Sequence, residues 1–204
     1  MSNKLYVKRS YRQARQETRT FHIAVEGQTE EIYFQSLANH LKIRAEIEIY
    51  KHDTDIKNTI ETVKKKTEFS QIWLVFDYPQ HTEHRKRFER AVSENQSNDI
   101  LKFAISVPEF EVWFLFHFSS STAPLTKTKL FEELKQSSRL PRYRKATNCF
   151  DSLITKLDSA EKNAKKIGAD HQKNSDTDFP NPSSGVVNLV RELRALKEKR
   201  VGVK

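Results

Sequence analysis

The chain has 204 residues, 36% of them hydrophobic and 31% charged, and its 36 Lys and Arg against 27 Asp and Glu give a formal charge of +9. This length suits one domain with a sizeable core, and no apolar run approaches the roughly 20 residues that span a bilayer. A single cysteine excludes an intramolecular disulfide framework and a cysteine-rich zinc finger, and the chain starts without an apolar leader. We therefore expect a cytoplasmic protein with no membrane contact, and the basic balance favours nucleic acid as its partner.

Residues 1–20 form a basic segment with two interspersed tyrosines and little apolar periodicity. Lysine and arginine pair with phosphate groups and tyrosine stacks on bases, so this segment can act as an arm that contacts nucleic acid. A solvated chain terminus explains the composition equally well. The residues assigned here to nucleic-acid binding are Lys8, Arg9 and Arg12.

Strands and helices are predicted to alternate four times between residues 21 and 118. The predicted strands are residues 21–25, 45–50, 72–76 and 100–107. The predicted helices are residues 29–41, 56–63 with a cap at Thr54 or Asp55, 82–97, and 108–118. This alternation predicts an α/β fold with a mostly parallel sheet that is flanked by helices on both faces.

Residues 119–204 are predicted to be helical and contain no strand candidate. The predicted helices are residues 125–136, 150–167 and 183–199, and the polar segment 170–182 is predicted to be a loop. We therefore divide the chain into a basic arm (1–20), an α/β core (21–118) and a helical C-terminal extension packed on the core (119–204).

Carboxylates follow three of the predicted strands. Glu26 follows the first strand, Asp77 the third, and Glu109 and Glu111 lie just beyond the fourth. Functional residues gather at the carboxyl ends of strands in open parallel sheets, so these acids are expected to converge. Converging carboxylates repel one another, which suggests that they bind Mg²⁺ or Mn²⁺. Glu30, one helical turn after Glu26, can face the same cleft or simply favour the helix N-terminus.

Glu111 lies in the apolar sequence Phe110-Glu111-Val112-Trp113-Phe114, where an isolated carboxylate is costly. Three interpretations compete for it: a metal ligand, a buried partner for an arginine or lysine, and an exposed helix face. Glu109, directly after a proline, can instead serve only the helix N-terminus.

Basic residues and histidines follow Asp77 in the next predicted helix. His81 and His84 have His-x-x-His spacing but lack a third ligand at motif spacing, which makes zinc a weak hypothesis. His81 is better suited to orienting a substrate phosphate. Arg85 and Lys86 are assigned to binding the nucleic-acid backbone, with a solvated helix face as the alternative.

Four motifs together carry a family resemblance. They read Val25-Glu26-Gly27-Gln28-Thr29-Glu30, Val75-Phe76-Asp77, Pro108-Glu109-Phe110-Glu111-Val112-Trp113 with His117-Phe118, and Asn181-Pro182-Ser183-Ser184-Gly185-Val186-Val187. The chain resembles the RloB-like proteins in these motifs, over nearly its whole length. This resemblance implies a Toprim-like fold and an association with bacterial restriction and phage-defence loci.

The resemblance also implies a metal-dependent nuclease that cleaves RNA or DNA in anti-phage defence by abortive infection. In Toprim domains a strand-end glutamate and a later Asp-x-Asp pair collect the metal. Glu26 matches the glutamate and Asp77 the first aspartate, whereas Pro79 stands where the second aspartate is expected. The residues expected to be catalytic are Glu26, Asp77 and Glu111, and Glu30 is expected as a further ligand of Mg²⁺ or Mn²⁺.

The departure at Pro79 keeps an alternative function open. The chain could be a catalytically degenerate subunit that only binds nucleic acid or another component of a defence complex. A partner ATPase encoded nearby and a homodimer are further expectations for the protein.

Overall fold

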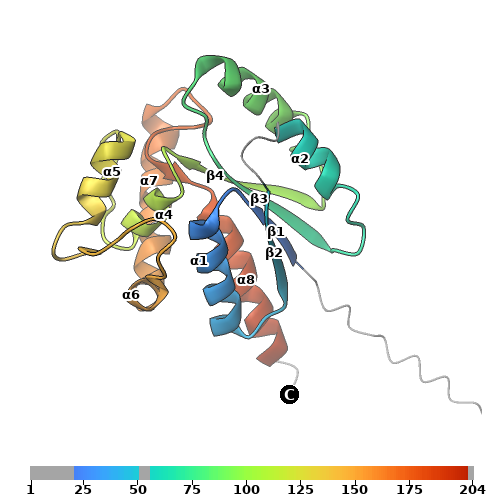
Figure 1. Cartoon of the computed structure of the whole chain (residues 1–204). Coiled ribbons are helices and arrows are strands. Elements are labelled where there is room, and N and C mark those ends of the chain that lie inside the picture. Colours follow the sequence, from blue (N-terminus) through green and yellow to red (C-terminus); the bar gives the residue numbers. More distant parts are fainter. Residues whose placement is uncertain (1–20, 51–55, 202–204) are drawn as a thin grey trace, which may run out of the picture.

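The computed structural model describes residues 21–50 and 56–201, with side chains to Glu198 (Figure 1). The expected nucleic-acid ligands Lys8, Arg9 and Arg12, and the expected helix caps Thr54 and Asp55, lie outside the described residues.

Five strands form one sheet in the order β2-β1-β3-β4-β5. The parallel strands are β1 (Phe21–Val25), β2 (Ala45–Ile49), β3 (Gln71–Asp77) and β4 (Leu101–Val107). A helix follows each of the first three strands, and such a crossover returns the chain to the same end of the sheet. The expected α/β fold with a mostly parallel sheet is confirmed, and it is consistent with a Toprim-like domain.

The described helices agree with the predicted ones in place, with shifted ends. They are α1 (Gln28–Leu41), α2 (Ile56–Val63), α3 (Thr82–Ser93), α4 (Glu111–Phe116), α5 (Lys127–Leu134), α6 (Phe150–Ile154), α7 (Leu157–Asn174) and α8 (Val186–Val201). The helix predicted at residues 150–167 is two helices, and α7 continues into the segment that was predicted to be a loop. No described helix is long and apolar enough to cross a membrane.

The expectation that residues 119–204 contain no strand is wrong at β5 (Ser183–Ser184). These two residues pair antiparallel with the last two residues of β4, and the Oγ atoms of Ser106 and Ser184 lie 2.9 Å apart. A strand of two residues has no alternation of apolar and polar side chains, so the sequence carried no signal for it.

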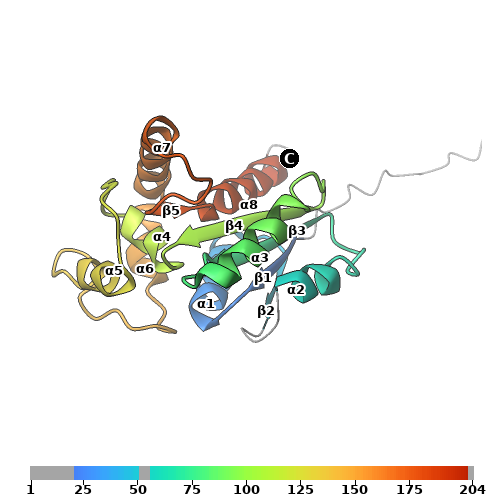
Figure 2. The ribbon, with the colours of Figure 1, turned by 90° about the horizontal axis from the view of Figure 1, so that it is seen from above.

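Both faces of the central strands β1 and β3 are buried. Ile23 and Val25 of β1 pack in a cluster with α1, α4 and α8, whereas Ala24 packs in a second cluster with α2 and α3. Burial on both faces explains the continuous apolar run Ile72–Phe76 of β3. Figures 1 and 2 show α4, α5, α6 and α7 grouped beyond one end of the strands, the end toward which the β4 arrow points.

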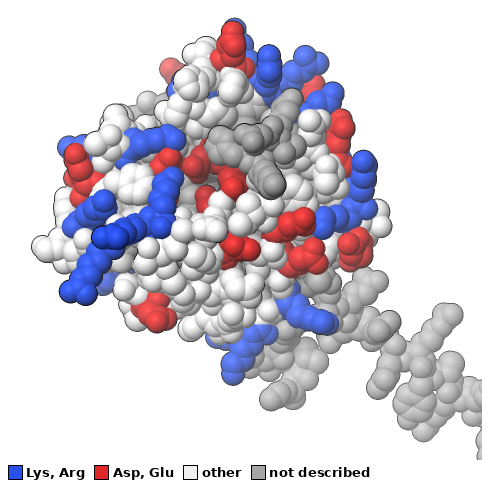
Figure 3. All heavy atoms as spheres, in the orientation of Figure 1, with Lys and Arg blue, Asp and Glu red and all other residues white. Residues whose placement is uncertain are grey.

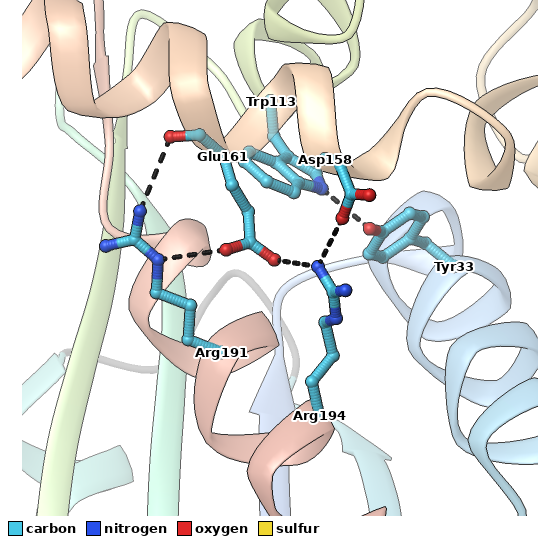
Figure 4. Close-up of polar contacts among 6 residues, drawn as sticks. All are labelled: Tyr33, Trp113, Asp158, Glu161, Arg191 and Arg194. Atoms are coloured by element: carbon cyan, nitrogen blue, oxygen red, sulfur yellow. Dashed lines mark hydrogen bonds and ion pairs between the residues drawn. The ribbon is translucent and has the colours of Figure 1, made fainter.

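The C-terminal helices share an apolar core with the sheet. One buried cluster runs from Ile23 through Trp113 of α4 to Leu189 of α8. Polar contacts add to this packing (Figure 4): the Trp113 indole donates to the Tyr33 hydroxyl over 2.8 Å, and Arg194 of α8 pairs with Asp158 of α7 over 2.8 Å. The extension is therefore held to α1 and to the sheet along its length.

Gly185 marks the place where α8 meets β4. Its amide donates to the Ile105 carbonyl over 2.8 Å. A Cβ at this position would lie 3.0 Å from the Ile105 nitrogen and 3.1 Å from the Ala104 Cα, both atoms of a strand within the sheet. Because that backbone is held by its own ladder, a side chain at residue 185 would force α8 away from the sheet.

We expect Gly185→Ala to lower the free energy of unfolding by about 1–3 kcal/mol through this overpacking. The matched control is Gly168→Ala in α7, where an added Cβ meets nothing within 4 Å. Since alanine favours a helix interior, the control should raise stability by about 0.5–1 kcal/mol. Chemical denaturation of the full chain measures both, and equal stabilities of the two variants would contradict the packing argument.

Candidate functional site

The turn from β1 to α1 brings two acids to the carboxyl edge of the sheet. Glu26 follows the last residue of β1, Gly27 caps α1, and Glu30 lies in its first turn. The φ of Gly27 is −152°, an extended value open to any residue, so its backbone does not demand glycine. A Cβ at Gly27 would instead lie 3.1 Å from a carboxylate oxygen of Glu30. The glycine gives the Glu30 carboxylate room to fold back over the turn.

Backbone amides tie the acids of neighbouring strands together. The Asp77 amide at the end of β3 donates to Glu26 Oε2 over 2.9 Å. Asp77 Oδ1 in turn accepts from the Phe110 amide, just before α4, over 2.6 Å. The ends of β1, β3 and β4 are thus linked through two carboxylates. These carboxylates lie at the carboxyl edge of the sheet, where the sequence predicts them.

The acids raise one another's pKa values. Burial raises the pKa of Asp77 well above its ordinary value, and the charges of Glu26, Glu30 and Glu111 raise it further. Burial, with Glu111 and Glu26, raises the pKa of Glu30 to about 7. Burial also raises the pKa of Glu111. Carboxylates in such a setting take up either protons or a cation, because their ionised forms repel.

Glu111 is fully buried, which excludes the interpretation as an exposed helix face. Its Oε1 accepts from the Tyr143 hydroxyl over 2.8 Å and lies 3.9 Å from the Lys145 ammonium. These contacts agree with the interpretation of Glu111 as a buried partner for a lysine. Its role as a metal ligand stays a prediction, as do those of Glu26, Glu30 and Asp77.

Glu109 is held by two lysines. Its carboxylate lies 2.6 Å from the Lys127 ammonium and 3.2 Å from that of Lys145. Because α4 begins only at Glu111, Glu109 precedes the helix, and its described partners are side chains of the C-terminal extension. These ammonium groups offset part of the negative charge at this edge of the sheet.

The segment around α5 and α6 also brings Lys127, Tyr143 and Lys145 to the acids, and none of these was predicted from the sequence. Next to Lys145, Ala146 adopts a φ of 57°, and its amide donates to Thr29 Oγ1 over 3.0 Å. A left-handed residue other than glycine costs roughly 1–2 kcal/mol, so contacts around it must hold it. The many basic residues in this segment are visible in the sequence, but no local pattern indicates that the segment contacts α1.

The basic residues predicted on α3 have different surroundings. Arg85 Nε donates to the Pro79 carbonyl over 2.8 Å, and its guanidinium lies 5.3 Å from the centre of the Tyr78 ring. Lys86 and His81 are exposed, and the His81 ring packs edge-on against His84 with their centres 5.9 Å apart. Arg85 thus supports the loop at Pro79, and Lys86 is free to face solvent. Their roles in binding stay predictions.

Among the described residues, one group of side chains has the spacing of metal ligands, and it lies apart from the acids at the strand ends. One nitrogen of His22 and one oxygen each of Glu46 and Glu48 lie within 4.8 Å of one another, so these residues could hold a metal ion. His22 is on β1 and the two glutamates are on β2. This cluster was not predicted from the sequence, because Glu46 and Glu48 alone fit the solvent-facing side of a strand.

Comparison with known proteins identifies one family. The family model described as RloB-like protein matches residues 21–193, which is most of the chain. No curated protein and no solved structure matches the chain.

The raised pKa values predict that the metal-free protein loses stability as the pH rises. The ordinary pKa of a glutamate near 4.5 rises to about 7 at Glu30 in the folded chain. The folded state therefore binds this proton more tightly, so its stabilising effect is complete below pH 4.5 and is lost as the pH rises through 7. Glu30→Gln should remove the part of this dependence that Glu30 causes and stabilise the protein at pH 8 by about 1–3 kcal/mol.

Chemical denaturation in EDTA at pH 5 and pH 8 measures this effect. Glu132→Gln, an exposed change on α5, serves as the control and should retain the dependence of the wild type. The same loss of stability in Glu30→Gln as in the wild type would contradict the assignment.

Proposed function

Since the chain belongs to the RloB-like protein family, we propose that it is a divalent-metal-dependent phosphodiesterase that cleaves RNA or DNA in bacterial anti-phage defence. One observation carries this proposal: Glu26, Glu30 and Asp77 converge at the carboxyl edge of a parallel sheet. Acids that repel one another at this place are typical of a site for a cation. The defence role rests on the resemblance to proteins of restriction and phage-defence loci.

The donor set fits Mg²⁺ or Mn²⁺, because every proposed ligand is a carboxylate oxygen. Glu26 and Asp77 would hold the ion, with Glu30 or Glu111 as a further ligand. When bound, such an ion lowers the pKa of a water molecule and stabilises the charge that develops on the phosphoryl group.

The residues of the chain have separate tasks in this proposal. The Asp77 amide orients Glu26, and the Phe110 amide orients Asp77, so both carboxylates are preorganised by backbone donors. Glu30, with a pKa of about 7, can hold a proton at its carboxylate until a cation replaces it. Lys145, beside Glu109 and Glu111, presents an ammonium group close to the acids, where it can pair with a substrate phosphate.

The substrate backbone is proposed to cross the segment that carries Lys145. Figure 3 shows acidic side chains near the middle of the face and Lys and Arg side chains bordering them on the α5 side. Arg142 and Arg144 flank the buried Tyr143 and are exposed. Exposed arginines near the acids can bind the flanking phosphates, while the acids act on one phosphodiester bond. Lys86 of α3 is proposed as a further phosphate contact.

A second function is favoured by Pro79 and by the lysines. With proline at the expected position of the second aspartate, a ligand of the family pattern is missing. Lys127 and Lys145 already pair with Glu109, so part of the acid charge is neutralised within the chain. A subunit that binds nucleic acid, or another component of a defence complex, without cleaving would have these features. Under either function, we also propose a partner ATPase and a homodimer. Assays should therefore add the candidate ATPase and determine the oligomeric state.

We predict cleavage of tRNA, single-stranded RNA or plasmid DNA with Mn²⁺, and none in EDTA. Asp77→Asn and Glu26→Gln should each reduce the rate at least about 100-fold, since each removes a proposed ligand. The control Glu132→Gln should cleave at the wild-type rate. Cleavage by Asp77→Asn at the wild-type rate would exclude this site. Binding with no cleavage by the wild type, with the candidate partner ATPase present, would establish the second function.

Charge reversal tests where the backbone binds. The double variant Arg142→Glu, Arg144→Glu should weaken binding of the cleaved nucleic acid at least about 10-fold near 0.1 M salt and reduce the salt dependence of binding. Fluorescence anisotropy in EDTA measures binding without cleavage. Lys162→Glu, Lys165→Glu on the exposed side of α7 is the matched control for net charge. An equal loss in both double variants would show a general charge effect and would contradict the proposed path.

A further inference from the structure

A histidine lies between two glutamates on the sheet surface that faces α2 and α3. His22 of β1 is opposite Glu46 of β2 in the ladder, and Glu48 is two residues further on the same side of β2. His22 Nδ1 lies 3.4 Å from Glu46 Oε1, and His22 Nε2 lies 3.7 Å from Glu48 Oε2. The imidazole is therefore within reach of both carboxylates, which are half exposed.

His22 itself is fully buried, and its Nδ1 has no hydrogen-bond partner among the described residues. A buried polar atom without a partner costs about 1–3 kcal/mol, and native proteins rarely leave one unexplained. The Phe69 ring packs on the imidazole with the ring centres 5.0 Å apart, so water has little access from that side. The unpartnered nitrogen points into a group of acids, which is the environment of a metal ligand.

The Lys66 ammonium is the cation that pairs with both glutamates of this group. Its ammonium lies 3.3 Å from Glu46 Oε1 and 2.9 Å from Glu48 Oε2. The Tyr50 hydroxyl also donates to Glu48, over 3.1 Å. The same hydroxyl lies 3.3 Å from His22 Nε2, so Nδ1 is the imidazole nitrogen without a hydrogen bond among the described residues.

We propose that His22, Glu46 and Glu48 form a second metal site, for a transition-metal dication of the Zn²⁺ or Co²⁺ class, from which a bound ion displaces Lys66. One imidazole nitrogen with two carboxylate oxygens suits such an ion better than Mg²⁺, which prefers oxygen ligands alone. The site is distinct from the acids at the strand ends, because Glu26 follows His22 by four residues, about 13 Å along an extended strand.

A metal ion at this site would connect the edge strand β2 to the neighbouring strand β1. β2 is the outermost strand on its side of the described sheet, and its side chains are only partly buried. An ion held by His22 on one side and by Glu46 and Glu48 on the other would join β2 to β1. Binding to the folded chain alone raises its stability in proportion to the logarithm of the free metal concentration.

The test uses Asp77→Asn as the background, since this change removes a ligand of the proposed catalytic site, and titrates the protein with Co²⁺ alone. Visible absorption of bound Co²⁺ and calorimetry report binding. We expect one equivalent of Co²⁺ to bind. The double variant Glu46→Gln, Glu48→Gln should weaken the affinity for Co²⁺ at least about 10-fold, and Lys66→Met should increase it at least about 10-fold. Both glutamates are half exposed, so the double variant is expected to fold, and circular dichroism checks this.

The control is Glu83→Gln, an exposed glutamate on α3, which should bind as the background does. No binding at about 1 mM Co²⁺ by either the background or Lys66→Met would overturn the proposal. Binding that survives the loss of both glutamates would overturn it as well. Since the background lacks Asp77, a failure of the nuclease proposal and a failure of this one give separate results.

Discussion

Two hydrogen bonds hold the carboxyl edge of the sheet together, and the candidate active site depends on them. The Asp77 amide binds Glu26, and the Phe110 amide binds Asp77, so main-chain donors join the ends of β1, β3 and β4 through carboxylates. Without such donors the acids would separate, because their charges repel. The parallel sheet supplies the necessary alignment, since all of its main strands end at one edge. The order and direction of the strands therefore determine where the acids of the site lie.

The C-terminal extension takes part in the site. Tyr143 and Lys145 reach Glu111, and the Ala146 amide binds Thr29 at the start of α1. The left-handed backbone at Ala146 is a local cost that this contact offsets. The same extension shares the apolar core of the sheet, so the position of Lys145 is fixed by packing as well as by charge. A change in the α5–α6 segment should therefore alter the surroundings of the acids at the strand ends.

Lysine serves the same physical purpose at both acid clusters. Lys145 lies beside Glu109 and Glu111, and Lys66 lies beside Glu46 and Glu48. An ammonium group within 4 Å of two carboxylates lowers their mutual repulsion in the metal-free protein. Under the two proposals it would also compete with an incoming cation. At both clusters the ammonium group therefore occupies the position that a bound cation would take under the two proposals.

The sequence by itself determined the alternation of strands and helices, the parallel sheet, and the convergence of Glu26 and Asp77, because hydrophobic periodicity and strand-end position are local properties. It could not reveal β5, since two residues make no pattern, nor choose among the three interpretations of Glu111. Tertiary structure alone decided that Tyr143 and Lys145 join that glutamate from 32 and 34 residues away in the chain. It likewise placed His22 between Glu46 and Glu48, because strand register, a contact between distant segments, determines which side chains face one another.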